Sequence, residues 1–446
     1  MFVWLGEIPH LVAWSKIEED LTVGSINRSF IKNNKPPCMC NCHPIYNHLM
    51  NSLKKHFLLD PNIVFLNHGS FGATPKPVFR EYQHWQRQLE KQPVEFLGRR
   101  ATNLMAEARV ALGKYLGTHA DNLIYTQNVT ISLNIVARSL ELGSGDEVLT
   151  TDHEYGAMDR TWRFLSKERG FRYINHAISI PIQTEESFVD DFWRGFNSNT
   201  RVIFISHITS PTAIIFPVKE IVRRAREAGI LTVIDGAHVP GQIPLHLDSL
   251  GADFYGGNLH KWLCAPKGAG FLYARPEVQY LLKPLVVSWG YESEAPSGST
   301  FIDEHEWWGT RDIAAFLSVP AAIEFLEKHN WDSVRDACHD LARDAQQRIC
   351  QLTGLAPLHA SRDSDGWFRQ MFTAPLPADT DIASLKSRLY DEHRIEVPLV
   401  EWSPSPVVGE GAGVRVGNKL IRVSVQGYNT KRDVDTLCHA LSLLLG

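Results

Sequence analysis

The sequence predicts an α/β fold in which a large domain holds a mostly parallel β-sheet and a smaller C-terminal domain is α+β. Three observations support this prediction. From Ile63 onward, short runs of β-branched and aromatic residues alternate with segments of helical periodicity, as in proteins built from strand–helix–strand units. Residues 201–237 contain one complete unit of this kind. After about Pro320, charged amphipathic helices dominate and strands become fewer.

The bulk composition indicates a folded protein with more than one domain. The chain has 446 residues, of which 44% are hydrophobic and 21% charged, close to the average of globular proteins. A formal net charge of -5 gives no basic field for nucleic acid, so we expect a small-molecule substrate. No uncharged apolar run in the sequence approaches the roughly 18 residues of a membrane span, so none is expected.

The seven cysteines do not form a disulfide pattern. Their odd number and thin spread over a long chain favour a reducing, cytoplasmic location. The cysteine-rich run at residues 38–42 has no second Cys/His pair at zinc spacing, so we expect no metal site. This run belongs to residues 1–58, which we expect to form an irregular extension. The large domain is expected over residues 59–320 and the small domain over residues 321–446.

The first strand–helix–strand segment lies between Leu123 and Thr151. Residues 124–126 form a short β-rich run, and residues 131–140 follow with helical spacing. The glycine-rich turn at residues 143–146 then leads into a second β-rich run. This order predicts a strand, a helix and a strand.

The clearest unit follows at residues 201–237. Residues 202–205 form a continuous β-rich run, as expected of a strand that is buried on both faces. Apolar residues then recur at helical spacing until Gly229, which predicts the end of the helix. Residues 231–234 form the next buried strand. We therefore predict a βαβ crossover here.

Two ionisable residues follow this crossover. Asp235 ends the strand predicted at residues 231–234, at the edge where open α/β sheets bind ligands. An Asp followed by Gly is also typical of an ordinary turn. Lys261 lies where a short predicted strand meets a loop, between His260 and Trp262. A solvated surface lysine is the alternative, but these neighbours would be unusual for one.

Together the two residues suit an aldehyde cofactor built on a pyridine ring. A lysine amine condenses with an aldehyde, and a carboxylate facing the pyridine nitrogen keeps that nitrogen protonated. A protonated ring accepts electrons from a substrate carbanion. Lys261 and Asp235 are suitably placed for these tasks.

The phosphate of such a cofactor needs an anion site. Asn128, Val129 and Thr130 lie at a predicted strand-to-helix junction, where free amides and the helix dipole favour an anion. An ordinary helix N-cap explains the same local sequence equally well. His153 and Tyr155 follow the next predicted strand and are candidates for stacking on the ring.

Three further positions complete the candidate site. Ala237 is a candidate for packing on the opposite face of the ring. Arg422 alternates with Ile421 and Val423 in a predicted strand, so its side chain lies on the other face from theirs. An Arg fork binds a carboxylate through two parallel hydrogen bonds. A surface salt bridge is the alternative role for Arg422.

These motifs together resemble the class V aminotransferase family of fold-type I pyridoxal 5'-phosphate (PLP) enzymes. The resemblance rests on the order and spacing of five motifs: Asp-Gly-Ala-His at 235–238, His-Lys at 260–261, Gly-Thr at 309–310, Arg-Val-Ser at 422–424 and Gly-Tyr-Asn at 427–429. Residues 66–72, 152–157 and 260–268 are similar to the isopenicillin N epimerase-like branch of this family.

The resemblance implies a homodimer with active sites at the subunit interface. It implies that Lys261 binds PLP as a Schiff base and that Asp235 faces the pyridine nitrogen. It also implies that His238 lies near the phenolic oxygen of PLP. The residues it implies near the phosphate are Thr130, Asn258, His260 and, reaching the neighbouring subunit, Thr310.

The same resemblance makes Arg422 the residue that binds the substrate carboxylate. The ring-stacking residue is either His153 or Tyr155, and we favour His153. We therefore expect Lys261, Asp235 and His153 to be the catalytic residues.

The expected reaction begins when Lys261 removes the Cα proton of an amino-acid substrate. Reprotonation from the opposite face gives an epimerase, which is the favoured reading, although the sequence names no second acid. Loss of a group from Cβ gives a C–S lyase, and transamination is the third alternative. Cysteine desulfurases of this family carry a loop cysteine, whereas residues 369–422 contain none. A non-catalytic binding protein with the same fold would be expected to lack Lys261 or Asp235.

Overall fold

The computed structural model describes residues 53–360, 366–402 and 418–446. These residues belong to one compact unit that spans residues 43–446. Most of the expected N-terminal extension, including the cysteine-rich run at residues 38–42, lies outside the described residues.

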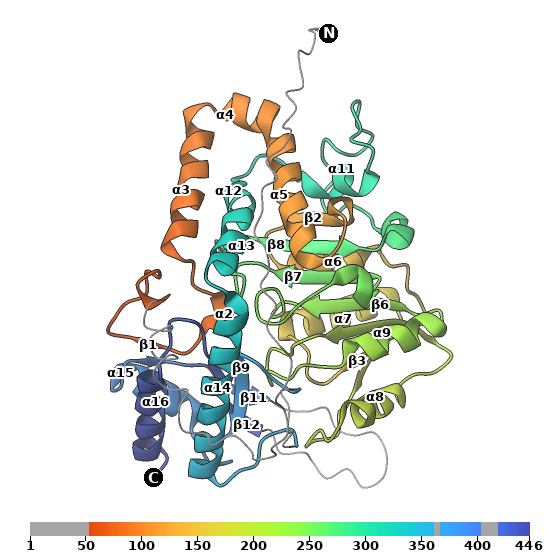
Figure 1. Ribbon diagram of the computed structural model, residues 1–446. Coiled ribbons are helices and arrows are strands. Elements are labelled where there is room, and N and C mark those ends of the chain that lie inside the picture. Colours follow the sequence, from red (N-terminus) through yellow and green to blue (C-terminus); the bar gives the residue numbers. More distant parts are fainter. Residues whose placement is uncertain (1–52, 361–365, 403–417) are drawn as a thin grey trace, which may run out of the picture. The chain divides into compact units, whose positions relative to one another are not determined.

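The larger part of this unit is built on a seven-stranded sheet (Figure 1). Four neighbouring pairs of strands are parallel, and only β8 (Gly270–Ala274) runs antiparallel to its two neighbours. The prediction of a mostly parallel sheet is therefore confirmed. In spatial order the strands are β2 (Leu123–Thr126), β8 (Gly270–Ala274), β7 (Phe254–Asn258), β6 (Leu231–Gly236), β5 (Thr200–Ser206), β3 (Glu147–Thr151) and β4 (Arg172–His176).

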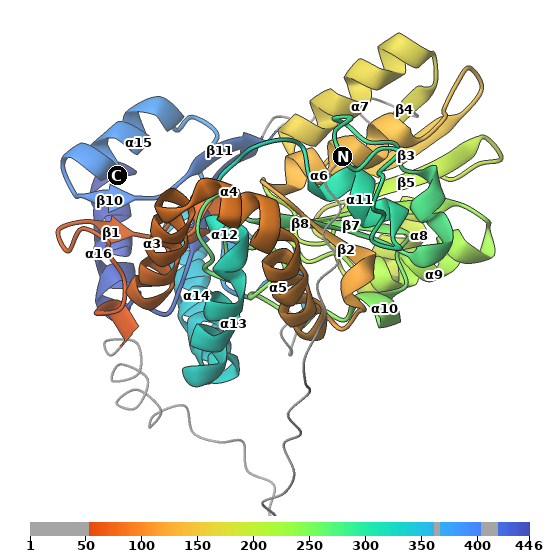
Figure 2. The same ribbon diagram turned by 90° about the horizontal axis from the view of Figure 1, so that it is seen from above.

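Helices cover both faces of this sheet because its strands are apolar on both faces. Val202 and Phe204 of β5 join a buried cluster with α6 (Val129–Ser139) and α7 (Gly156–Arg169). Ile203 and Ile205 of the same strand join a second cluster, with α8 (Glu185–Trp193) and α9 (Val218–Glu227). Figure 2 shows α7 and α9 on opposite sides of these strands. The continuous β-rich run at residues 202–205 is thus buried on both faces, as predicted.

The predicted βαβ crossover is formed by β5, α9 and β6. The two strands pair in parallel, with Ser206 opposite Asp235. The helix ends at Glu227, and Gly229 takes a positive φ of 69°, a conformation that glycine adopts without steric cost. The helix predicted at residues 131–140 begins earlier, at Val129, because the Asn128 side chain accepts a hydrogen bond from the Ile131 amide and caps it.

The C-terminal elements form a smaller antiparallel sheet, which confirms the α+β prediction for this part. Its order is β11 (Leu399–Trp402), β12 (Asn418–Ser424) and β9 (Met371–Pro375). The helices of this part are α14 (Trp331–Thr353), α15 (Ile382–Asp391) and α16 (Lys431–Leu444). β1 (Val64–Phe65) pairs in parallel with β10 (Ile395–Glu396), which ties the chain ahead of the large sheet to the C-terminal elements.

The remaining helices flank the two sheets. Helices α3 (Lys76–Lys91) and α5 (Ala101–Leu116) pack against α12 (Ala314–Leu317) and α13 (Val319–Lys328), as Figures 1 and 2 show. Among the described residues, no helix has both the length and the apolar character needed to cross a bilayer. These helices are α2 (His68–Phe71), α3 (Lys76–Lys91), α4 (Pro93–Glu95), η1 (Phe96–Arg100), α5 (Ala101–Leu116), η2 (Ala120–Asn122), α10 (Leu247–Leu250), η3 (Pro276–Leu281), α11 (Thr300–Glu306), α12 (Ala314–Leu317) and α13 (Val319–Lys328).

Candidate active site

A cavity of about 600 Å³ opens at the carboxyl ends of β5, β6 and β7. This is the edge where open parallel sheets bind ligands. Ten of the residues singled out in the sequence line it, although they come from four separate segments: Asn128, Val129, Thr130, Tyr155, Asp235, Ala237, His238, Asn258, His260 and Lys261.

Asp235 contributes an unsatisfied oxygen to this cavity. The side chain is 2% exposed, and its Oδ1 accepts a hydrogen bond from the Ala237 amide at 2.9 Å. Its Oδ2 is buried and has no hydrogen-bond partner among the described residues. Burial raises the pKa of Asp235 to about 6, although the Ala237 amide and the charge of Lys261 oppose the shift. A cationic N–H group placed against Oδ2 would satisfy this oxygen.

Lys261 lies at the end of the next strand, where its amine contacts a histidine. The Lys261 Nζ is 3.1 Å from His238 Nε2, and Trp262 Nε1 donates a hydrogen bond to His238 Nδ1. A neutral His238 therefore carries its hydrogen on Nε2, directed at the lysine nitrogen. Burial, assisted by the positive charge of Arg422, lowers the pKa of Lys261 to about 7. Much of the amine is thus uncharged at neutral pH and is a nucleophile.

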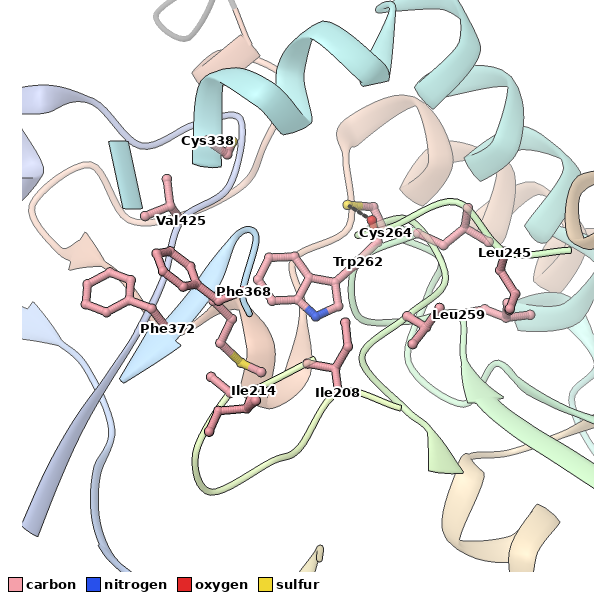
Figure 3. Packing of buried hydrophobic residues seen from close by; sticks show 14 of the residues in the cluster. Ile208, Ile214, Leu245, Leu259, Trp262, Cys264, Cys338, Phe368, Phe372 and Val425 are labelled. Carbon is pink, nitrogen blue, oxygen red and sulfur yellow. Dashed lines mark hydrogen bonds between the residues drawn. The ribbon is translucent and has the colours of Figure 1, made fainter. Parts of the chain in front are cut away.

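Buried side chains pack against the loop that carries Lys261 and fix its position. The Trp262 side chain is fully buried and packs among apolar side chains that include Ile208 and Phe368 (Figure 3). His68 is also fully buried, and its Nε2 lies 2.9 Å from the Lys261 carbonyl oxygen while its Nδ1 lies 2.9 Å from the Tyr428 hydroxyl. Sequence reasoning missed His68, although it lies in the motif at residues 66–72.

The N-terminus of α6 forms the opposite end of the cavity. Asn258 Oδ1 accepts the Val129 amide at 2.9 Å, and Asn128 Oδ1 accepts the Ile131 amide at 3.1 Å. Nearby, Gln127 Oε1 is buried without a partner among the described residues. The positive end of the helix dipole favours an anion at this position, and the Thr130 side chain also lines the cavity there.

Arg422 lies just behind the cavity wall and is 6% exposed. Its Nη1 donates to the Ser210 carbonyl oxygen at 2.6 Å, and its Nη2 donates to Ser70 Oγ at 3.0 Å. Its Nε is buried without a hydrogen-bond partner, and no carboxylate of the described residues pairs with it. Burial lowers the pKa of Arg422 to about 10, while the Tyr155 hydroxyl opposes the shift. Arg422 is therefore a buried cation without an acidic partner among the described residues.

Besides Arg422, two predicted site residues, His153 and Thr310, do not line the cavity. His153 is fully buried, with its ring centroid 4.4 Å from that of Trp402 and its Nδ1 2.8 Å from Thr212 Oγ1. Tyr155, two residues further on, does line the cavity and is 42% exposed. Thr310 is exposed and does not reach the cavity within this chain.

The cavity also contains serines that sequence reasoning missed. Ser70 and Ser210 line it and hold Arg422, and Ser206 lines it at the end of β5. The rule that pointed to Asp235, namely a polar residue directly after a buried parallel strand, applies equally to Ser206. Ser210 lies in the loop after β5, where the sequence gives no comparable signal.

Comparison with known proteins identifies the family. The family model of Aminotransferase class-V matches residues 64–437. Isopenicillin N epimerase of Amycolatopsis lactamdurans is 35% identical over 398 residues, covering 86% of this chain and 96% of that protein. A probable chloroplastic L-cysteine desulfhydrase of Arabidopsis thaliana is 26% identical, covering 86% of this chain and 84% of that protein.

Solved structures share the fold. A cysteine desulfurase from Thermococcus onnurineus NA1 superposes with a TM-score of 0.73 at 20% identity, over 88% of this chain and 97% of the other. A mutant of the C–S lyase C-DES, with glycine linked covalently to its PLP cofactor, gives a TM-score of 0.70 at 19% identity, over 89% and 98% of the two chains. The chain belongs to the class V aminotransferase family of fold-type I enzymes, and its cofactor is PLP.

Proposed function

We propose that this protein is an epimerase that inverts the Cα of an amino acid or a peptide-like substrate. The observation that carries the proposal is the presence of two proton-carrying groups on different elements of one cavity, Lys261 after β7 and Tyr155 before α7. The 35% identity to an isopenicillin N epimerase, over 96% of its length, supports the same reaction.

The polar atoms of the cavity fit the polar groups of PLP. Asp235 Oδ2, buried and unpartnered among the described residues, would hold the protonated ring nitrogen. The N-terminus of α6, with Thr130, Asn258 and His260, would hold the phosphate. Lys261 would bind the aldehyde carbon, with His238 near the phenolic oxygen.

The two faces of the ring would be covered by Ala237 and by an aromatic residue from the loop after β3. Tyr155 lines the cavity, whereas His153 packs on Trp402 outside it. We therefore assign the ring-stacking role to Tyr155 in place of His153.

Bound PLP supplies an electron-accepting ring that lowers the barrier to breaking a bond at the substrate Cα. The chain's own residues supply the rest. Arg422 would bind the substrate carboxylate through its guanidinium group, which fixes the position of the adjacent Cα. Lys261, whose pKa of about 7 leaves much of its amine uncharged near neutral pH, would take the Cα proton.

Inversion requires an acid on the other side of Cα. Tyr155 suits this task because it lines the cavity and its charge acts on the pKa of Arg422, the residue that would hold the carboxylate bonded to Cα. His238 is less suitable because it lies beside Lys261, at 3.1 Å. A tyrosine hydroxyl is an effective general acid in proteins. Tyr155 is accordingly proposed to return a proton to the face away from Lys261.

Elimination is the second candidate because a relative at 26% identity is a probable L-cysteine desulfhydrase. Such a reaction needs a leaving group at Cβ but no second acid at Cα. Transamination shares the first proton removal and is the third candidate.

We further propose that the protein is a cytoplasmic homodimer. The exposed position of Thr310 agrees with a residue that serves the neighbouring subunit. The four cysteines within the described residues are free, as expected in a reducing compartment: Cys264, Cys338, Cys350 and Cys438.

The test is to incubate the PLP-loaded protein with a panel of L-amino acids and peptides in heavy water. Epimerisation gives Cα deuterium in the inverted product, detected by NMR and chiral chromatography. Pyruvate and ammonia instead would establish elimination, and a 2-oxo acid would establish transamination. Lys261→Ala is the control and is expected to give none of these products.

A further inference from the structure

We propose that Glu154 is a positioning residue that shares a single proton with Asp235, and that this sharing keeps the negative charge on Asp235. The proposal rests on the role proposed above for Asp235 toward the ring nitrogen of PLP. It does not depend on whether the reaction is epimerisation or elimination.

Glu154 is held in a fixed position by neutral groups. It lies in the loop between β3 and α7 and is 9% exposed. Its Oε1 accepts a hydrogen bond from Thr151 Oγ1 at 2.7 Å. Its Oε2 lies 2.6 Å from Ser206 Oγ and accepts the Ser206 amide at 3.0 Å. Among the described residues, the hydrogen bonds to this carboxyl group therefore come only from groups without charge.

Ser206 connects Glu154 to Asp235. Ser206 and Asp235 are opposite each other near the ends of the adjacent parallel strands β5 and β6. Both line the cavity, whereas Glu154 does not. Glu154 thus contacts Ser206 from outside the cavity, and Ser206 is paired with Asp235 on the next strand. Glu154 therefore affects Asp235 through its charge and does not touch a ligand in the cavity.

The surroundings of Glu154 contain acidic groups but no cationic partner. The titratable groups near it are Asp235 on β6, Tyr173 on β4, and its chain neighbours Asp152 and His153. Within the part of the chain that the structure describes, no Lys or Arg forms an ion pair with Glu154. On the Asp235 side, the charge of Lys261 lowers the pKa of Asp235 and so favours the negative charge there. Two carboxyl groups buried close together do not readily both ionise near neutral pH.

The proton is expected on Glu154 and the charge on Asp235. Burial and, to a smaller extent, the charge of Asp235 raise the pKa of Glu154 to about 8, against the opposing effect of the Ser206 and Thr151 hydrogen bonds. Burial raises the pKa of Asp235 only to about 6. Between these values Asp235 remains an anion that can pair with the ring nitrogen. At lower pH Asp235 is neutralised, and at higher pH two like charges face each other.

Infrared spectroscopy of the full-length protein, with and without PLP, tests this proposal. The PLP-free wild type should show a protonated carboxyl band at pH 7 that disappears with a midpoint near pH 8. Glu154→Gln should remove this band. Asp235→Asn should retain it but lower its midpoint, because the neighbouring negative charge is gone. Asp253→Asn, a buried carboxyl group elsewhere, is the matched control and should change neither.

The absorption of bound PLP gives a second measurement. The wild type should show a spectral change on the alkaline side of neutral pH that Glu154→Gln lacks, because a neutral amide cannot ionise. A protonated carboxyl band that survives in Glu154→Gln, or a midpoint that Asp235→Asn does not move, overturns the proposal. If Glu154→Gln fails to fold, the Asp235→Asn shift still decides. A protein that binds PLP but does not epimerise any substrate leaves these results unchanged, so the two proposals fail separately.

Discussion

Replacing Lys261 with methionine should stabilise the PLP-free protein. Burying the charged amine of Lys261 lowers its pKa from 10.5 to about 7. At about 1.36 kcal/mol for each pH unit, this shift corresponds to a loss of roughly 5 kcal/mol in the free energy of unfolding. Methionine has a similar shape without the charge. Because Asp235 loses a favourable neighbour in this variant and water in the cavity screens the amine, we expect a net gain of about 2–4 kcal/mol at pH 7.

The size of this stabilisation depends on pH. Between the folded-state pKa near 7 and the unfolded value of 10.5, the unfolded chain binds more protons at Lys261 than the folded chain does. The cost of Lys261 is therefore complete at pH 7 and below, and it disappears as the pH rises toward 10.5. The free energy of unfolding of Lys261→Met should exceed that of the wild type most at pH 7 and least at pH 10.

Urea denaturation of PLP-free protein at both pH values measures this difference, at one fixed protein concentration. Lys114→Met, an exposed position on α5, is the control and should change stability by less than about 0.5 kcal/mol. The reasoning is refuted if Lys261→Met is no more stable than the wild type at pH 7, or if its advantage is the same at pH 10.

Three further predictions concern the cavity. Tyr155→Phe should retain Cα deuterium exchange but lose inversion by about 10²–10⁴-fold, and inversion at the wild-type rate would remove Tyr155 as the acid. Arg422→Gln should raise the KM for carboxylate substrates by at least about tenfold, from the loss of a charged hydrogen bond, without changing PLP binding; an unchanged KM measured by steady-state kinetics would contradict its role. His153→Gln should lower stability by about 1–3 kcal/mol through its buried bond to Thr212 and leave the PLP absorption maximum unchanged; a shifted maximum in a variant of wild-type stability would restore His153 to the site.

Much of the large sheet was predictable because its signals are local. The strand at residues 202–205 is apolar at every position, and the helix of the crossover ends at a glycine. Strand pairing between distant segments has no such signal. The antiparallel insertion of β8 between β2 and β7, and the pairing of β1 with β10, depend on contacts between segments far apart in sequence.

In the candidate site too, some features had a local signal in the sequence and others depended on contacts between distant segments. Asp235 lies near the end of β6 and Lys261 follows the adjacent parallel strand β7, so their meeting at one edge of the sheet follows from the parallel order. The choice between His153 and Tyr155 did not follow, because neighbouring loop residues point in directions that only the backbone path decides. Glu154 was overlooked because a charged residue in a loop suggests exposure, whereas here the ends of β3 and β5 bury it.

The most direct test of the account is to identify the residue that binds PLP. The PLP-loaded protein is reduced with borohydride, digested and analysed by mass spectrometry. We predict that reduced PLP is attached to the peptide containing Lys261 and that the visible or near-ultraviolet absorption of the cofactor is absent in Lys261→Ala. Attachment at another lysine, or no attachment to a correctly folded protein, would contradict the central claim.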